Sequence, residues 1–294
     1  MAASPRPGVK RTLPLEWQHA DSRGIWQGAL DDTARTLSKV DLVVVLRLLP
    51  VLVVNDFKQR YRGQALGVVW SFLNPLLTMT VLSLVFGHVF RVEVPHFPVF
   101  VLLGVIFWQF TSAGWTAATN SFVRHSALVK NAAFPRALIP TAAVLSQLLN
   151  LTMEVAVLLV LLPFFPGAAR FSPALLFLPV PLVLLMACVL GAGLATAVLH
   201  PRFRDVAFLV TTVQLLLYWL TPVFYPRAAL PLGMKRALAI NPLTGLLEAF
   251  RGIVMKGELP PLQSFSMTAG ICVVVLVLGI LLFRRHSRSL ADFL

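Results

Sequence analysis

Long apolar segments recur along this chain and limit its possible folds more than any other feature. Six stretches hold about 20 mostly apolar residues each, which is the length that an α-helix needs to cross a bilayer. We predict an all-α integral membrane protein with six spans, at residues 68–90, 99–119, 138–162, 174–199, 206–225 and 265–283. Prolines stand near most of the proposed ends, where a missing backbone N–H costs least.

The composition agrees with burial in lipid. Of the 294 residues, 57% are hydrophobic and 13% are charged, whereas soluble domains carry about 25% charged residues. A soluble fold of this size could not keep so much apolar surface away from water. The formal net charge of +13 comes from basic residues beside the apolar segments. This pattern is typical of membrane proteins and does not indicate nucleic-acid binding.

The distribution of Lys and Arg predicts the orientation of the chain. With six spans and a cytoplasmic N-terminus, 18 of the 25 basic residues fall in cytoplasmic segments and 7 in outer segments. Membrane proteins keep such an excess on the cytoplasmic side. The N-terminal residues lack the apolar core of a signal peptide. We therefore expect both termini in the cytoplasm.

Two segments outside the spans also have helical patterns. The first has a short apolar stretch interrupted by Arg47 and Pro50 and flanked by basic residues. It indicates an amphipathic helix on the cytoplasmic face, with a short seventh span as the alternative. The segment before the last span predicts two short helices, either re-entrant or forming an extracytoplasmic cap. The chain thus divides into an N-terminal extension (1–33), the interface helix (34–57), the six-span domain (58–285) and a cytoplasmic tail (286–294).

The sequence has no motif for energy coupling or catalysis. It lacks a GxxxxGK[ST] phosphate loop, an HExxH zinc motif and a GxSxG nucleophile elbow. The six histidines lack metal-ligand spacing, and Cys188 and Cys272 do not form a CxxC pair. Glu154 is the one acidic residue well inside a span, which leaves little material for acid–base chemistry or ion coupling. We expect no catalytic residue, metal or cofactor on this chain.

Two sets of residues are candidates for function. Gln147, Asn150 and Glu154 lie on one face of the third span, where they line a polar path or form hydrogen bonds between helices. Residues 120–136 form a basic segment with helical potential, which either inserts into the groove of a partner or is an ordinary cytoplasmic loop. Aromatic residues near the span ends either form the interfacial belt or face a path for sugar rings.

Three stretches, in order, resemble one family of transporters. RYRGQALGVVWSFLNPLLTM (60–79), NSFVRHSALVKNAAFPRALIP (120–140) and INPLTGLLEAFRGIV (240–254) resemble polysaccharide-export permeases of the ABC-2 type. These are membrane subunits for O-antigen, capsule, teichoic acid and related glycans. The resemblance covers most of residues 35–285, and the N-terminal 30 residues look like an extension beyond the family pattern.

The resemblance implies a homodimeric permease in the bacterial inner membrane that exports a lipid-linked glycan. Two copies of a separate nucleotide-binding ATPase subunit would bind ATP and Mg²⁺. The implied channel residues are Trp70, Phe72, Trp108, Tyr218 and Tyr225, beside the polar stripe of the third span. The implied ATPase contacts are Arg47, Lys58, Arg60, Arg62, Arg124, His125, Leu128, Lys130, Phe134 and Arg136.

Three other functions remain as alternatives. The same architecture could export a lipid or a drug. An ion-coupled carrier would transport along a gradient without ATP. An integral membrane enzyme acting on lipids would depend on Glu154, His125 and His200 for turnover.

Overall fold

The computed structural model describes residues 46–63, 67, 69–89, 94–131 and 135–287. Within these ranges all regular structure is helical and no strand occurs. Residues 46–61 form a helix that runs four residues beyond the predicted end at 57. The extension 1–33, the first part of the interface helix and most of the C-terminal tail lie outside the described residues.

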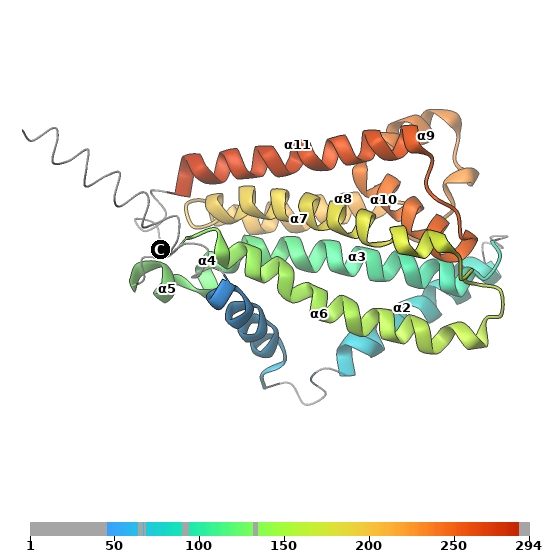
Figure 1. The fold of residues 1–294 in the computed structure, drawn as a ribbon, viewed down its shortest axis with the longest axis horizontal. Coiled ribbons are helices and arrows are strands. Elements are labelled where there is room, and N and C mark those ends of the chain that lie inside the picture. Colours follow the sequence, from blue (N-terminus) through green and yellow to red (C-terminus); the bar gives the residue numbers. More distant parts are fainter. Residues whose placement is uncertain (1–45, 64–66, 68, 90–93, 132–134, 288–294) are drawn as a thin grey trace, which may run out of the picture. The chain divides into compact units, whose positions relative to one another are not determined.

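Five helical segments are long and apolar enough to cross a membrane (Figure 1). They are α2 (Val69–Leu84) continued to Gly87, α3 (Phe97–Thr119), α6 (Leu138–Leu161) continued to Phe164, Pro173–Leu199 with α7 (Pro179–Leu199), and α11 (Leu262–His286). Each corresponds to one predicted span. The described part of the chain is therefore a multi-pass helical membrane domain, as its apolar segments predict.

The remaining predicted span, 206–225, is shorter in the structure. Helix α8 (Asp205–Leu220) has 16 residues, which is about 24 Å at 1.5 Å per residue, against a hydrocarbon core of about 30 Å. Thr221 has an extended backbone (φ −97°, ψ 132°), because the following Pro222 disfavours a helical conformation at the preceding residue. The helix consequently ends five residues before the predicted boundary.

The two short helices predicted before the last span are present. Helix α9 (Leu232–Ala239) and helix α10 (Pro242–Arg251), continued to Lys256, meet at an angle of 99°. The Asn241 side chain caps α10 by accepting a hydrogen bond from the Leu243 amide at 3.0 Å, and Pro242 follows at the first helical position. The bent pair could form a sixth crossing or a re-entrant hairpin, by length and composition.

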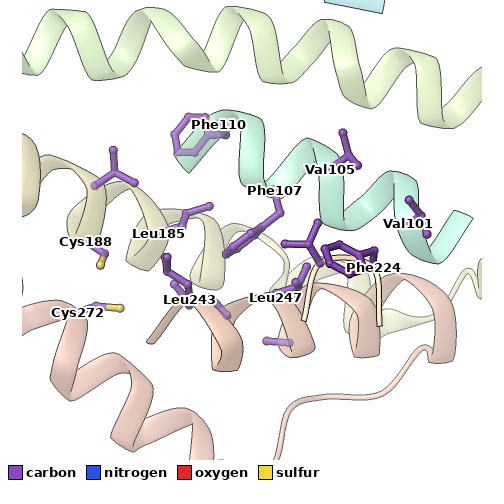
Figure 2. Packing of buried hydrophobic residues seen from close by; sticks show 14 of the residues in the cluster. Val101, Val105, Phe107, Phe110, Leu185, Cys188, Phe224, Leu243, Leu247 and Cys272 are labelled. Carbon is purple, nitrogen blue, oxygen red and sulfur yellow. The ribbon is translucent and has the colours of Figure 1, made fainter. Parts of the chain in front are cut away.

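Helix α3 is the central helix of the domain and packs against α2, α6, α7, α8 and α10. Figure 2 shows Phe107 of this helix among Leu185, Phe224 and Leu247, which come from three other segments. Helices α7 and α11 also pack closely, with the buried Cys188 and Cys272 facing each other across their contact (Figure 2).

Candidate functional site

A groove of ≈ 680 Å³ lies between α2, α3 and α8. Residues three and four apart share one face of a helix, and each of these helices contributes such a row. The rows are Asn74 and Thr78 from α2, Val105, Trp108, Gln109, Ser112, Ala113, Thr116 and Ala117 from α3, and Thr211, Gln214, Leu215 and Tyr218 from α8. The α3 row is about 18 Å long at 1.5 Å per residue.

Hydrogen bonds hold α8 against α3 along the groove. The Gln214 amide nitrogen donates to the Ser112 carbonyl oxygen at 3.1 Å and to the Thr116 hydroxyl at 3.1 Å. Gln214 is buried, so these bonds satisfy a polar group that would otherwise be costly inside the bilayer. Most of the remaining α8 side chains are exposed. The groove wall is therefore held by specific polar contacts.

Two of the five aromatic candidates line this groove. Trp108 and Tyr218 lie on opposite helices with their ring centroids 5.3 Å apart. Trp70 lines a neighbouring pocket, whereas Phe72 and Tyr225 line neither cavity. The Tyr225 hydroxyl instead donates to the Trp219 carbonyl oxygen at 2.8 Å. Of the five predicted aromatic residues, Trp108 and Tyr218 are therefore the two that a ligand in the groove would contact.

The neighbouring pocket, of ≈ 210 Å³, lies between the helix 46–61, α2, α3 and α6. It carries the polar stripe of the third predicted span. Asn150 donates to the Gln147 side-chain oxygen at 2.9 Å and accepts a bond from the Tyr61 hydroxyl at 2.5 Å. Glu154 is buried on the same wall. Asn150 thus forms a hydrogen bond between helices, and all three residues of the stripe line the pocket.

The groove and the pocket adjoin each other, because Arg60, Asn74, Gln109 and Ala113 line both cavities. Arg124, the last residue of α4 (Ser121–Arg124), also lines the groove. Next to it the His125 ring nitrogen lies 3.4 Å from the Asp56 carboxylate. Burial raises the pKa of Asp56, while the charges of His125, Arg124 and Arg60 act in the opposite direction. This contact joins the helix 46–61 to α4.

The other predicted partner contacts within the described residues come from the helix 46–61, from the residues that follow α4 and from the segment before α6. Arg47, Lys58 and Arg62 are exposed on the helix 46–61, and Leu128 is exposed on α5 (Ser126–Asn131). Arg136 donates to the Ser287 carbonyl oxygen just beyond α11. The side chain of Lys130 and the whole of Phe134 lie outside the described residues. In the described ranges no cluster of His, Cys, Asp and Glu could hold a metal ion.

A buried cation at the opposite end was missed by the sequence analysis. Arg251, near the end of α10, donates to the carbonyl oxygens of Pro222 at 2.6 Å, Val223 at 2.5 Å and Phe100 at 3.0 Å. Its guanidinium carbon lies 3.4 Å from the Phe100 ring centroid. Arg251 thereby ties α10 to the start of α3 and to the turn after α8. The sequence feature that could have indicated this buried cation is the single Arg within the apolar pattern of residues 240–254.

These features define a multi-pass helical membrane protein with a polar, partly aromatic groove along its central helix. Residues 47–255 match the family model described as ABC-2 type transporter. The match covers more than two thirds of the chain, and the chain belongs to this family.

Several relatives are similar over nearly their whole length. The chain is 30% identical over 247 residues to the O-antigen export system permease protein RfbA of Myxococcus xanthus, which covers 83% of this chain and 94% of the relative. It is 27% identical over 259 residues to the RfbA permease of Klebsiella pneumoniae, covering 87% and 98%. It is 25% identical to the polysialic acid transport protein KpsM of Escherichia coli, covering 81% and 93%.

Proposed function

We propose that this chain is the permease subunit of an ABC exporter that moves a lipid-linked polysaccharide across the bacterial inner membrane. The observation that carries the proposal is the groove along α3. Its wall combines amide and hydroxyl groups with the adjacent rings of Trp108 and Tyr218. Sugars need hydrogen-bonding partners for their hydroxyls and flat apolar surfaces for their C–H faces. Relatives named as O-antigen and polysialic acid transport proteins support the choice of cargo.

A homodimer would close this groove into a channel. Both helices at its edges expose large apolar side chains, including Leu77 and Val81 on α2 and Leu215 and Trp219 on α8. Against lipid such side chains need no protein partner, but a polar groove between them does need cover in the bilayer. A second copy placed edge to edge would supply that cover and bring a second aromatic pair to the path.

In this proposal a separate ATPase subunit supplies the energy, with one copy for each permease. The sequence has no phosphate loop, so ATP and Mg²⁺ belong to the partner. The contact surface is the end with the helix 46–61, α4 and α5, which faces the cytoplasm together with both termini. The Asp56–His125 contact would pass a movement of α4 to the interface helix. Arg47, Lys58, Arg62 and Leu128 are exposed there for a partner.

The test is transport by the purified permease–ATPase complex in proteoliposomes. We expect lipid-linked glycan to cross the membrane with ATP, and not when the phosphate-loop lysine of the ATPase is replaced. Glycan movement driven by an ion gradient without ATP would refute the proposal in favour of a coupled carrier. ATP-dependent movement of lipid or drug without any glycan movement would assign the chain to the alternative export class.

A further inference from the structure

We infer that Arg251 is a positioning residue for transport, which holds the ring of Tyr218 in the groove wall through the turn 221–224. The inference rests on the proposed function and adds to it a residue outside the path. Arg251 and Phe224 line neither the groove nor the smaller pocket. Any effect of Arg251 on the cargo must therefore pass through the residues between it and the groove.

The first step is the contact between Arg251 and the turn. The Arg251 side chain is buried, and its guanidinium nitrogens donate to the carbonyl oxygens of Pro222 at 2.6 Å and Val223 at 2.5 Å. The same guanidinium donates to the Phe100 carbonyl oxygen at 3.0 Å, in the first turn of α3. A guanidinium presents its donors as a rigid planar fork, so these bonds fix both the position and the orientation of the turn relative to α3.

Close packing against α3 leaves the turn little freedom. All four residues 221–224 are buried. A Cβ atom at Gly104 would lie 2.3 Å from the Val223 carbonyl oxygen and 2.6 Å from an Arg251 guanidinium nitrogen. The next residue of α3, Val105, lines the groove. The turn is therefore set directly against the backbone of the helix that forms the groove.

The second step leads from the turn to the groove through aromatic rings. Phe224, the last residue of the turn, is buried, and its ring centroid lies 5.7 Å from that of Tyr218 and 5.3 Å from that of Trp219. Tyr218 lines the groove and lies 5.3 Å from Trp108. These distances are typical of aromatic pairs in contact. Tyr218 therefore packs against a ring of the groove wall and against a ring that Arg251 fixes.

The chemistry of the contact explains why an arginine is present at this position. Burying a cation away from water costs free energy, and apolar packing would hold α10 against α3 without that cost. An apolar side chain, however, gives no directional bonds to the backbone of the turn. Because the bonds of Arg251 are directional, they orient the turn as well as hold it.

The experiment measures ATP-dependent transport by the permease–ATPase complex in proteoliposomes, as a function of the mole fraction of lipid-linked glycan. Arg251→Lys keeps the charge but loses the fork, and Phe224→Leu keeps the arginine but removes the ring. We expect each to raise the mole fraction for half-maximal transport about fivefold, which is the loss of one aromatic contact. Tyr218→Ala should have a similar effect. Adding either variant to Tyr218→Ala should change nothing further, because all three act through the same ring.

Arg227→Gln is the matched control. Arg227 follows the same turn, but its bonds go to Glu248 of α10 at 2.8 Å and to the Lys235 carbonyl oxygen of α9 at 3.0 Å. It lines neither cavity. This variant should have the half-maximal mole fraction of the wild type, since its lost bonds do not hold Phe224.

The inference is refuted if the effects of Arg251→Lys and Tyr218→Ala multiply to about 25-fold, as independent effects would. It is also refuted if Arg251→Lys leaves transport unchanged, or lowers only the maximal rate, which is the effect of a smaller folded fraction. If Arg251→Lys fails to assemble, Phe224→Leu decides, and an unchanged half-maximal mole fraction in that variant refutes the inference. A wild-type complex that transports no glycan would refute the proposed function and this inference with it.

Discussion

The contact between α7 and α11 permits no side chain at Gly279. A Cβ atom there would lie 2.0 Å from the Gly191 carbonyl oxygen and 2.7 Å from the Gly191 Cα. Carbon–oxygen contacts in proteins lie at about 3.3 Å or more, so the two backbones would have to separate by about 1.3 Å. Backbone atoms face each other on both sides, so no rotamer change can relieve the clash. Small residues of this kind let membrane helices approach closely.

Gly279→Ala should therefore lower the free energy of unfolding by about 2 kcal/mol, the middle of the range for an overpacked interior. That corresponds to about 30-fold in the ratio of folded to unfolded protein. The part of this loss that comes from helix separation reflects weakened dispersion contacts, which hold helices together where lipid supplies no hydrophobic driving force. The measurement is reversible unfolding of the purified permease in mixed micelles, followed by circular dichroism.

Gly270→Ala is the matched control, because it lies on the same helix and its added Cβ would have nothing within 4 Å. Alanine favours a helix over glycine by up to about 1 kcal/mol, so this variant should be as stable as the wild type or slightly more so. Equal stability of the Gly279 and Gly270 variants would show that the α7–α11 contact is looser than described, and would refute the reasoning.

Three more predictions concern the groove, the hairpin and the interface helix. Arg251→Met leaves three carbonyl oxygens without their charged donor. We expect the free energy of unfolding in micelles to fall by about 3 kcal/mol. An unchanged free energy of unfolding would contradict the contact that Arg251 makes between α10 and α3. Trp108→Ala and Tyr218→Ala should each reduce ATP-dependent glycan transport several-fold, since an aromatic contact contributes about 1 kcal/mol, whereas unchanged transport would remove the aromatic pair from the path. The raised pKa of Asp56 means that the folded protein binds this proton more tightly than the unfolded protein does. The resulting stabilisation is present below the ordinary pKa of about 4 and is lost as pH rises through the raised value, so unfolding measured against pH should show this decline in the wild type and not in Asp56→Asn.

The sequence predicted the membrane-spanning helices well, because a run of apolar residues identifies a span without reference to its neighbours. It also predicted the break at Asn241–Pro242, since a capping side chain followed by proline acts locally. The end of α8 was placed too late for a related reason. Apolar residues continue past Leu220, and hydropathy alone does not register the constraint that Pro222 imposes on Thr221.

In the candidate site, too, the sequence predicted the features that depend on one helix and missed those that depend on contacts between helices. Helical spacing placed Gln147, Asn150 and Glu154 on one face, and they do share one pocket wall. Spacing could not choose among the aromatic residues, because Trp108 and Tyr218 meet only through the packing of α3 against α8. Arg251 was overlooked because its acceptors are backbone carbonyls of distant segments, which have no pattern in the sequence.

The sequence by itself determined that the chain crosses a membrane repeatedly, which segments do so and which residues on a helix share a face. These properties follow from apolar length and from the period of the helix, and both are local. Only the tertiary structure decided which faces meet. In lipid the contacts depend on close fit at positions such as Gly191 and Gly279, and on hydrogen bonds such as those of Gln214. Such contacts join residues far apart in the chain, and they bring Arg60, Arg124 and the ring pair of Trp108 and Tyr218 to one groove.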